Sequence, residues 1–329
     1  MPVEILQGDC REVLKSLPDC SIDCVVTSPP YFGLRDYGVH GQIGLEESPT
    51  AFVSELVSVF REVRRILIND GTVWLNLGDS YAGSWGAQGR TGDMADRSVV
   101  HARQIAAAPR KMSRTGSIPA GSNLKAKDRM LIPARVAIAL QDDGWWVRDE
   151  VIWHKLNPMP SSIKDRTTPC HEMVYMLSKS SRYYYDHEAI QEECVSDHPS
   201  GNGFKRGARL SYANADGSAR GNDAQWNDLG GRRNRRSVWT INTKPFPGSH
   251  FATMPPDLAE PCILAGCPKG GTVLDPFGGA GTTGLVAARH GRNAVLIELN
   301  PEYAQMAADR INADCPMFAD ATVKSLEKA

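Results

Sequence analysis

A short polar loop with two consecutive prolines is the part of this chain best suited to chemistry. Thr27, Ser28, Pro29, Pro30 and Tyr31 follow directly after an apolar run that predicts a short buried strand. The prolines end that strand and remove two backbone donors, which leaves a rigid loop with free carbonyl oxygens, a hydroxyl and an aromatic face. Such a loop can accept hydrogen bonds from an exocyclic amino group while Tyr31 stacks on the ring that bears it. A plain strand-ending turn remains the other interpretation.

A glycine-rich turn is the second candidate for chemistry. Gly279, Gly281 and Gly284 satisfy the pattern G-x-G-x-x-G between a predicted strand and a predicted helix. Glu298 ends the next predicted strand, near the offset of ~20 residues at which an acid holds a ribose. The pattern suits an adenosine-containing cofactor, so a nicotinamide-dependent dehydrogenase is one interpretation. The run Asp275–Phe277 counts against it, because a carboxylate and a bulky ring stand where a dinucleotide needs close backbone approach.

Predicted strands and helices that position these loops alternate along the chain. Strands are expected over residues 3–6, 22–27, 72–77, 148–153, 172–177, 237–241, 273–274 and 294–297, with a short hairpin partner at 183–185. Helices are expected over 11–17, 49–69, 133–141, 256–265, 282–290 and 301–312. This alternation favours an α/β fold with a doubly wound, mostly parallel sheet.

Composition limits the class of protein. The chain has 329 residues, of which 41% are hydrophobic, and this favours one large domain spanning residues 1–329 with insertions. No apolar run approaches the ~18 residues of a membrane span, and the first residues lack the pattern of a signal peptide. The eight cysteines include no C-x-x-C pair, so no metal site is expected, and a reduced, cytoplasmic protein fits best.

Two long segments carry most of the positive charge. Residues 81–130 contain nine basic and three acidic residues, and residues 201–246 contain the same numbers. Both are rich in Gly, Ser, Ala and Asn and lack periodicity, so they are expected to be loop-rich insertions. Although the net charge of the chain is −1, this uneven distribution favours a polyanionic partner. Two solvated, mobile loops are the alternative.

Together these motifs resemble the permuted, β-group DNA amino-methyltransferases, in which the catalytic loop precedes the loop that binds S-adenosylmethionine. Residues 27–31 match that family's (Asp/Ser/Asn)-Pro-Pro-(Tyr/Phe) loop, and residues 275–284 match its cofactor loop. The stretches 153–158, 165–166 and 171–172 resemble the segment beside its target base. Carried over residue by residue, the resemblance implies a cofactor site made of Asp9, Cys10, Thr27, His250, Phe251, Thr253, Asp275, Phe277, Gly279, Gly281, Thr282 and Glu298.

The resemblance also implies the reaction and the catalytic residues, which are Ser28, Pro29, Pro30 and Tyr31. A base flipped out of duplex DNA would stack on Tyr31, and the Ser28 hydroxyl and the Pro29 carbonyl would accept its amino hydrogens. Family members that methylate N4 of cytosine often carry Ser at the first loop position, whereas those that methylate N6 of adenine often carry Asp. Ser28 therefore favours N4 of cytosine, with N6 of adenine as the alternative.

Other acceptors are weaker interpretations. Methylation of carbon 5 of cytosine needs a cysteine nucleophile in the catalytic loop, and that position is held by Ser28. RNA or a small molecule is less suited than a long polyanion to two basic segments. A DNA-binding protein that kept only the cofactor fold would not need the intact catalytic loop.

Recognition of DNA is expected to fall to the insertions, which we place at residues 81–130 and 195–247. The first would clamp DNA or mediate dimer contacts, and the second would read the target sequence. The basic residues predicted to contact DNA are Arg35, Lys155, Arg232, Arg233, Arg235 and Arg236. Double-stranded DNA is the expected partner, and the resemblance also allows a homodimer and a cognate restriction endonuclease.

Overall fold

The computed structural model describes seven stretches of the chain, residues 1–34, 37–82, 124–158, 160–193, 232–243, 254–316 and 320–325. Contacts divide the chain into two compact units. Unit 1 comprises Met1–Asp186 and Ser237–Ala329, and unit 2 comprises His187–Arg236. Unit 2 therefore begins and ends earlier in the chain than the second insertion expected from the sequence, at 195–247.

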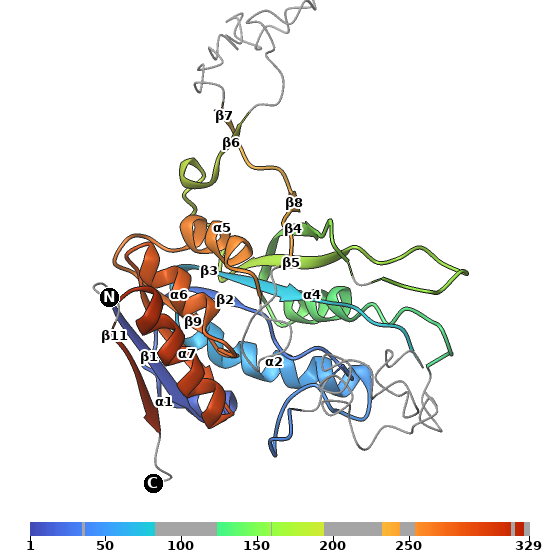
Figure 1. Ribbon diagram of the computed structural model, residues 1–329, viewed down its shortest axis with the longest axis horizontal. Coiled ribbons are helices and arrows are strands. Elements are labelled where there is room, and N and C mark those ends of the chain that lie inside the picture. Colours follow the sequence, from blue (N-terminus) through green and yellow to red (C-terminus); the bar gives the residue numbers. More distant parts are fainter. Residues whose placement is uncertain are drawn as a thin grey trace, which may run out of the picture. The chain divides into compact units, whose positions relative to one another are not determined.

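Unit 1 is built around a nine-stranded sheet with the order β11-β1-β10-β9-β2-β3-β5-β4-β8 (Figure 1). Its strands are β1 (Pro2–Gln7), β2 (Ile22–Thr27), β3 (Leu67–Leu77), β4 (Trp146–His154), β5 (His171–Ser178), β8 (Val238–Thr240), β9 (Thr272–Asp275), β10 (Asn293–Glu298) and β11 (Asp320–Ser325). Only β5 is antiparallel to both of its neighbours; every other pair in this sheet is parallel. The carboxyl ends of the other strands therefore share one edge of the sheet.

Helices cover both faces of this sheet. They are α1 (Cys10–Ser16), α2 (Pro49–Ile66), α4 (Ile132–Asp142), α5 (Pro256–Gly266), α6 (Thr282–Arg289) and α7 (Pro301–Asp314). Successive residues of a strand point to opposite faces. On β2, Val25 joins the core formed with α1, α2 and α4, whereas Cys24 faces α5, because a Cβ added at Gly266 would lie 2.8 Å from the Cys24 sulfur. The doubly wound, mostly parallel arrangement expected from the sequence is confirmed.

Local sequence explains the longest helix. Ser48 caps α2 by accepting a hydrogen bond from the Ala51 amide at 3.1 Å, and Pro49 occupies the first turn, where its missing N–H costs nothing. The apolar positions from Phe52 to Ile66 are buried on one face. The helix ends earlier than the predicted residue 69, because Leu67 pairs with Ile22 on β2 and begins β3.

Two further expectations differ from the structure. Residues 183–185 form no strand; instead, the Tyr184 amide donates to the Asp70 carbonyl at 2.8 Å, and the Tyr185 ring stacks on Trp74. The edge strand β11 was not expected, because its alternating pattern is short and mostly exposed. Among the described residues, no helix is long and apolar enough to cross a membrane, and no cluster of His, Cys, Asp or Glu is arranged to hold a metal ion.

Unit 2 contains little regular structure within its described residues. A 3₁₀ turn, η3 (Glu188–Ile190), precedes the strand β6 (Glu192–Glu193), which pairs antiparallel with β7 (Arg232–Arg233). Glu192 accepts hydrogen bonds from Arg233 at 2.8 Å and from Arg236 at 2.6 Å. Two of the four arginines of this unit that were predicted to contact DNA therefore share one carboxylate.

Candidate active site

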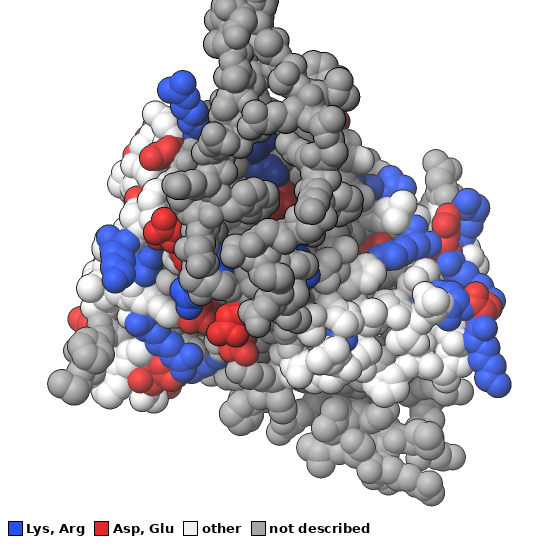
Figure 2. All heavy atoms as spheres, turned by 90° about the horizontal axis from the view of Figure 1, so that it is seen from above, with Lys and Arg blue, Asp and Glu red and all other residues white. Residues whose placement is uncertain are grey.

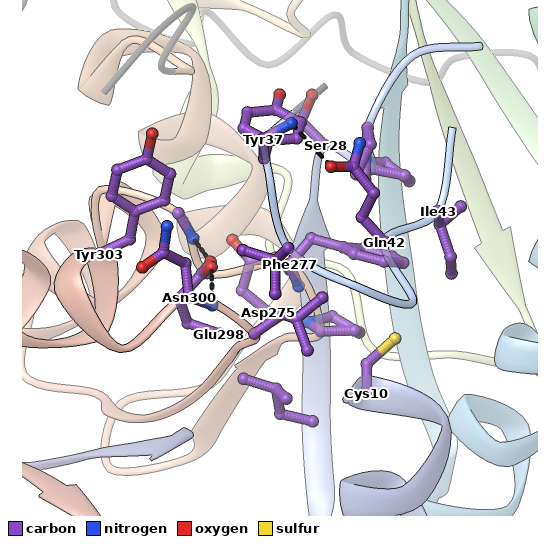
Figure 3. A pocket seen from close by; sticks show the side chains of 18 of the residues that line it. Cys10, Ser28, Tyr37, Gln42, Ile43, Asp275, Phe277, Glu298, Asn300 and Tyr303 are labelled. Carbon is purple, nitrogen blue, oxygen red and sulfur yellow. Dashed lines mark hydrogen bonds between the residues drawn. The ribbon is translucent and has the colours of Figure 1, made fainter. Parts of the chain in front are cut away.

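A pocket lies at the carboxyl edge of the sheet in unit 1, and we call it the central pocket. It is lined by residues from the loops after β1, β2, β9 and β10, from residues 34–43, and by Met254 and Tyr303. Figure 3 shows Glu298, Asn300 and Tyr303 on one side and Ser28, Tyr37 and Gln42 on the other. Both motifs singled out in the sequence, the catalytic loop and the glycine turn, therefore meet here, because β2 and β9 are neighbouring parallel strands.

A network of polar side chains on β3 and β5 holds the catalytic loop. The Ser28 hydroxyl donates to the side-chain oxygen of Asn76 on β3 at 3.2 Å, and the Tyr31 hydroxyl lies 3.1 Å from the same oxygen. The Tyr31 hydroxyl also donates to Glu172 on β5 at 2.7 Å. Burial and the nearby Glu172 carboxylate raise the pKa of Tyr31 well above its ordinary value, so its phenol remains a donor.

Close packing fixes the ring of the same tyrosine. A Cβ added at Gly78 would lie 2.4 Å from Cε2 of Tyr31, so any larger residue there would displace the ring. Gly78 directly follows β3, which pairs with β2 in parallel register. The ring is therefore placed by a glycine that the sequence motifs did not single out.

Lys155, which the sequence suggested as a DNA contact, belongs to this network. Its ammonium group pairs with Glu172 and lies 4.0 Å from the centroid of the Trp153 ring. The side chains of Lys155 and Glu172 are 16% and 18% exposed, respectively, so this ion pair is largely withdrawn from solvent. The structure thus pairs Lys155 with the carboxylate that anchors Tyr31.

A buried carboxylate joins the catalytic loop to the glycine turn. Asp275 ends β9 and accepts hydrogen bonds from the Thr27 hydroxyl at 2.6 Å, the Thr283 hydroxyl at 2.8 Å and the Phe277 amide at 3.0 Å. Burial raises the pKa of Asp275 despite these hydrogen bonds. Thr27 is fully buried and does not line the central pocket. In this structure it orients Asp275 and does not face the ligand space, contrary to the contact expected from the sequence.

The glycine turn is closed by the acid on the next strand. Glu298 accepts hydrogen bonds from the amides of Gly279 at 2.7 Å and Asn300 at 2.8 Å, and burial raises the pKa of its carboxyl. Gly281 has φ +75°, and a Cβ there would lie 2.8 Å from Cβ of Ala307 on α7. Gly281 is therefore required by the turn and by helix packing, and it does not line the pocket, whereas Gly279 and Thr282 do.

Asp9 and Cys10 form the floor of the pocket at the start of α1. Asp9 caps the helix through the Arg11 amide and also binds the Arg11 guanidinium. Burial alone would raise the pKa of Asp9, but the hydrogen bonds and charge of Arg11 outweigh it and the pKa is lowered. Burial raises the pKa of the Cys10 thiol to about 12, so this pocket cysteine stays protonated and is a poor nucleophile.

The sequence reasoning missed the loop over residues 37–44, which forms one wall of the pocket. The Arg11 guanidinium holds this loop through the Gly41 carbonyl at 2.6 Å. Gly44, with φ +105°, allows close packing, since a Cβ there would lie 3.2 Å from the Tyr31 carbonyl oxygen. The glycines at 38, 41 and 44, all with positive φ, were the available sequence signal for a tight loop beside the motif.

The charge of the central pocket limits what it can bind. Its described lining contains the carboxylates of Asp9, Asp275 and Glu298 and no Lys, Arg or His. A diphosphate would meet negative charge there, which counts against a nicotinamide dinucleotide. S-adenosylmethionine fits better. Its sulfur is cationic, the apolar faces of its adenine ring can pack against Phe277 and Ile297, and its ribose diol can donate hydrogen bonds to an acidic side chain.

Several predicted residues lie elsewhere. Arg35, His250, Phe251 and Thr253 fall outside the described residues, although the neighbouring Met254 lines the pocket. Asp165 and Arg166, which the resemblance placed beside the target base, line a separate groove on unit 1. The predicted site residues that do line the central pocket are Asp9, Cys10, Ser28, Pro29, Pro30, Tyr31, Asp275, Phe277, Gly279, Thr282 and Glu298.

Comparisons with known proteins agree with this geometry. The model of a DNA methylase family, the N6/N4 methyltransferases, matches residues 22–309. The chain is 44% identical over 310 residues to the type II methyltransferase M.Cfr9I of Citrobacter freundii, covering 94% of this chain and 88% of that protein. It is 46% identical over 307 residues to the type II methyltransferase M.XycI of Xanthomonas campestris pv. cyanopsidis, covering 93% and 87% of the two chains.

A solved structure agrees over the full length. The fold resembles that of a DNA modification methylase of Thermus thermophilus, solved with S-adenosyl-L-methionine, with a TM-score of 0.59 and 25% identity over 99% of each chain. The catalytic loop and the glycine turn are the features that the resemblance led us to expect. The chain therefore belongs to the N6/N4 family of DNA methylases, which use S-adenosylmethionine as cofactor.

Proposed function

We propose that this DNA methyltransferase modifies the exocyclic amino group of a base flipped out of duplex DNA, and that the base is cytosine, methylated at N4. One observation carries the proposal. The Ser28 hydroxyl donates its hydrogen to Asn76 at 3.2 Å. The lone pairs of the hydroxyl oxygen therefore remain to accept a hydrogen bond from the amino group of the base. The neutral serine at this position supports cytosine because the family's N4 enzymes often carry it.

The other loop residues have positioning roles in this proposal. The Tyr31 ring stacks on the flipped base, while its hydroxyl stays bonded to Glu172 and Asn76. The Pro29 carbonyl accepts the second amino hydrogen, and Pro30 stiffens the loop. With the amino group held by two acceptors, its nitrogen lone pair points into the pocket, and catalysis comes largely from this orientation.

The cofactor residues follow from the charge and shape of the pocket. S-adenosylmethionine supplies, when bound, an electrophilic methyl group on a cationic sulfur. Glu298 faces the ribose, Asp9 and Cys10 approach the adenine, and Phe277 covers an apolar face. Asp275, Gly281 and Thr27 hold the turn in place. His250, Phe251 and Thr253 are proposed to close over the methionine part, as the resemblance implies.

The biological setting is part of the same proposal. The relatives M.Cfr9I and M.XycI are named type II methyltransferases, which supports a role beside a cognate restriction endonuclease in the cytoplasm. Arg35 and the arginines at 232, 233, 235 and 236 are proposed to contact DNA. Arg233 and Arg236 would then leave their ion pairs with Glu192 and bind phosphate groups of the DNA. A homodimer through residues 81–130 remains a prediction from the sequence.

The test identifies the methylated nucleoside. The purified protein is incubated with mixed-sequence duplex DNA and S-adenosylmethionine, and the DNA is digested and analysed by mass spectrometry. We expect N4-methylcytosine. N6-methyladenine would show that Ser28 does not select the base, and no methylated nucleoside with intact cofactor binding would overturn the proposal.

A matched pair of variants tests the role of Ser28. Ser28→Ala removes the acceptor and should lower the single-turnover rate by roughly two- to tenfold, the cost of one hydrogen bond. Ser28→Thr keeps a hydroxyl and should retain more activity. Equal rates for the two variants would mean that the hydroxyl does not orient the amino group.

A further inference from the structure

A second concave surface lies on unit 1, apart from the central pocket, and we call it the basic groove. One wall consists of Tyr81, Lys127 and Arg129, and the other consists of residues 163–166 in the loop between β4 and β5. The described lining carries four basic side chains and one carboxylate, that of Asp165. This surplus of positive charge contrasts with the central pocket, whose charged lining is acidic.

The internal contacts of the groove leave positive charge for a ligand. Lys127 pairs with Asp165 at 2.7 Å and ties the two walls together. Arg129 pairs with Asp79 at 2.7 Å, a carboxylate only 7% exposed. Lys164 is exposed and forms no ion pair with any described residue. The guanidinium carbon of Arg166 lies 3.8 Å from the centroid of the Tyr81 ring, a stacking that orients a planar donor without neutralising its charge.

The groove lies close to the catalytic loop in space. Gly78, which packs against the Tyr31 ring, is three residues before Tyr81, a separation of at most about 11 Å in an extended chain. Strand β4, like β3, ends at the same edge of the sheet as β2. At about 3.4 Å of duplex axis per nucleotide, this separation corresponds to about three nucleotides.

Figure 1 shows the loop between β4 and β5 extending to the right, above the segment that leads into α4. In Figure 2, which is turned about the horizontal axis, Lys and Arg side chains gather at the same right-hand end, with a few acidic ones among them. The residues that line the basic groove and are exposed include Lys127, Lys164 and Asp165.

We propose that the basic groove binds the phosphodiester backbone of the substrate duplex, within about three nucleotides of the flipped base, and that Lys164 and Arg166 are phosphate ligands. Phosphate contacts fix the register of a protein on DNA without reading sequence. Both side chains suit this task. Lys164 carries a compact charge on a flexible chain, and Arg166 presents the N–H donors of a planar guanidinium in a fixed orientation. This inference rests on duplex DNA being the substrate.

The test compares the salt dependence of DNA binding. The full-length protein and the double variant Lys164→Ala/Arg166→Ala are titrated against a fluorescent mixed-sequence duplex at several salt concentrations, and log Kd is plotted against log salt. Each phosphate contact contributes about 0.9 to the slope, so we expect the slope of the double variant to fall by about 1.8. The affinity for S-adenosylmethionine should not change, because neither residue lines the central pocket.

A matched control removes the same charge elsewhere. Lys15 and Lys269 are exposed. Lys15 lies in the last turn of α1, which leads to the amino end of β2, and Lys269 precedes the amino end of β9, so Lys15→Ala/Lys269→Ala changes the opposite edge of the sheet. This control should keep the wild-type slope. An unchanged slope in the groove variant, or an equal fall in the control, would overturn the inference.

Two single variants sharpen the test. Lys164→Ala breaks no ion pair described here, so the protein should fold and the slope should fall by about 0.9. Arg166→Lys keeps the charge and loses the planar stacking on Tyr81, so the slope should stay while the affinity falls several-fold. If the wild-type protein neither binds nor methylates the duplex, the proposed function itself fails. If methylation persists and the slopes do not differ, only the groove assignment fails.

Discussion

At the scale of single residues, Tyr31 has two separable functions. Its hydroxyl is used by the protein, in hydrogen bonds to Glu172 and Asn76, whereas its ring is proposed to serve the substrate. Tyr31→Phe removes the hydroxyl, so the largely buried Glu172 carboxylate loses one hydrogen-bond donor. We expect a loss of about 1–3 kcal/mol in the free energy of unfolding with most of the methylation rate retained.

Tyr31→Ala removes the ring as well, and base stacking on an aromatic side chain contributes about 1–3 kcal/mol. The single-turnover rate should therefore fall by about tenfold or more in addition to the loss of stability. Thermal unfolding and rapid-quench methylation assays measure the two effects separately. Equal rates in Tyr31→Phe and Tyr31→Ala would mean that the ring does not contact the base.

The raised pKa of Asp275 predicts how the stability of the protein depends on pH. Burial raises the pKa of its carboxyl above the ordinary value. A group of this kind stabilises the fold fully below its unfolded pKa of about 3.9, and this contribution is lost as the pH rises through the folded pKa. The excess stability of the wild-type protein over Asp275→Asn should therefore be largest near pH 4 and shrink towards neutral pH.

Chemical denaturation of both proteins between about pH 4 and pH 8 tests this sign. The pKa of Glu298 is raised in the same direction, mainly by burial and partly by the charge of Asp275. Asp275→Asn removes that charge, so the change at Glu298 adds to the difference with the same sign. A difference that is constant or grows with pH would contradict a raised pKa for Asp275.

At the scale of elements, the end of β3 sets the position of the catalytic loop on β2. Gly78→Ala places a Cβ within 2.4 Å of the Tyr31 ring. We expect a folded protein whose methylation rate is lowered by about tenfold or more, because a misplacement of about 1 Å can cost a hundredfold in an oriented reaction. Single-turnover kinetics with saturating cofactor measures the effect.

Gly71, which lies within β3, provides the control. In Gly71→Ala the new Cβ would lie 2.7 Å from Leu67 and 2.8 Å from the Asp23 carbonyl oxygen, at the amino end of β3. This variant should lose stability but keep the methylation rate at a temperature where it is folded. If both variants lose the rate to the same extent, strand distortion explains the loss and Tyr31 displacement does not.

At the scale of the whole molecule, the cofactor should protect one unit and not the other. The described lining of the central pocket belongs entirely to unit 1. At a cofactor concentration of about 100 times Kd, binding stabilises the folded state by about 2.7 kcal/mol. We expect slower amide hydrogen exchange in residues 28–34, 37–44 and 275–281 and no change in the described residues of unit 2, 187–193 and 232–236. Protection of these residues of unit 2 by the cofactor alone would contradict this division.

The sequence by itself determined the alternation of strands and helices, the two loops and part of the pocket lining. Periodic burial and turn residues act locally, so they can be read without knowing which strands pair. The resemblance added the cofactor and the reaction. The glycine pattern of Gly279, Gly281 and Gly284 alone does not identify a cofactor, whereas the fold and both motifs together do. The boundaries that failed, at Leu67 and at residues 183–185, depended on pairing with Ile22 and packing on Trp74.

Only the tertiary structure decided which residues engage one another across the fold. Lys155 and Thr27 were expected to face ligands, but Glu172 and Asp275, which are distant in sequence, engage them inside the protein. Gly78, Asn76 and the loop at 37–44 became part of the site because β3 and α1 bring them there. Lys164 and Arg166 form a groove with Lys127 and Tyr81 for the same reason. Sequence patterns report the local environment of a residue, whereas hydrogen bonds and ion pairs between distant segments depend on how the sheet brings its strands together.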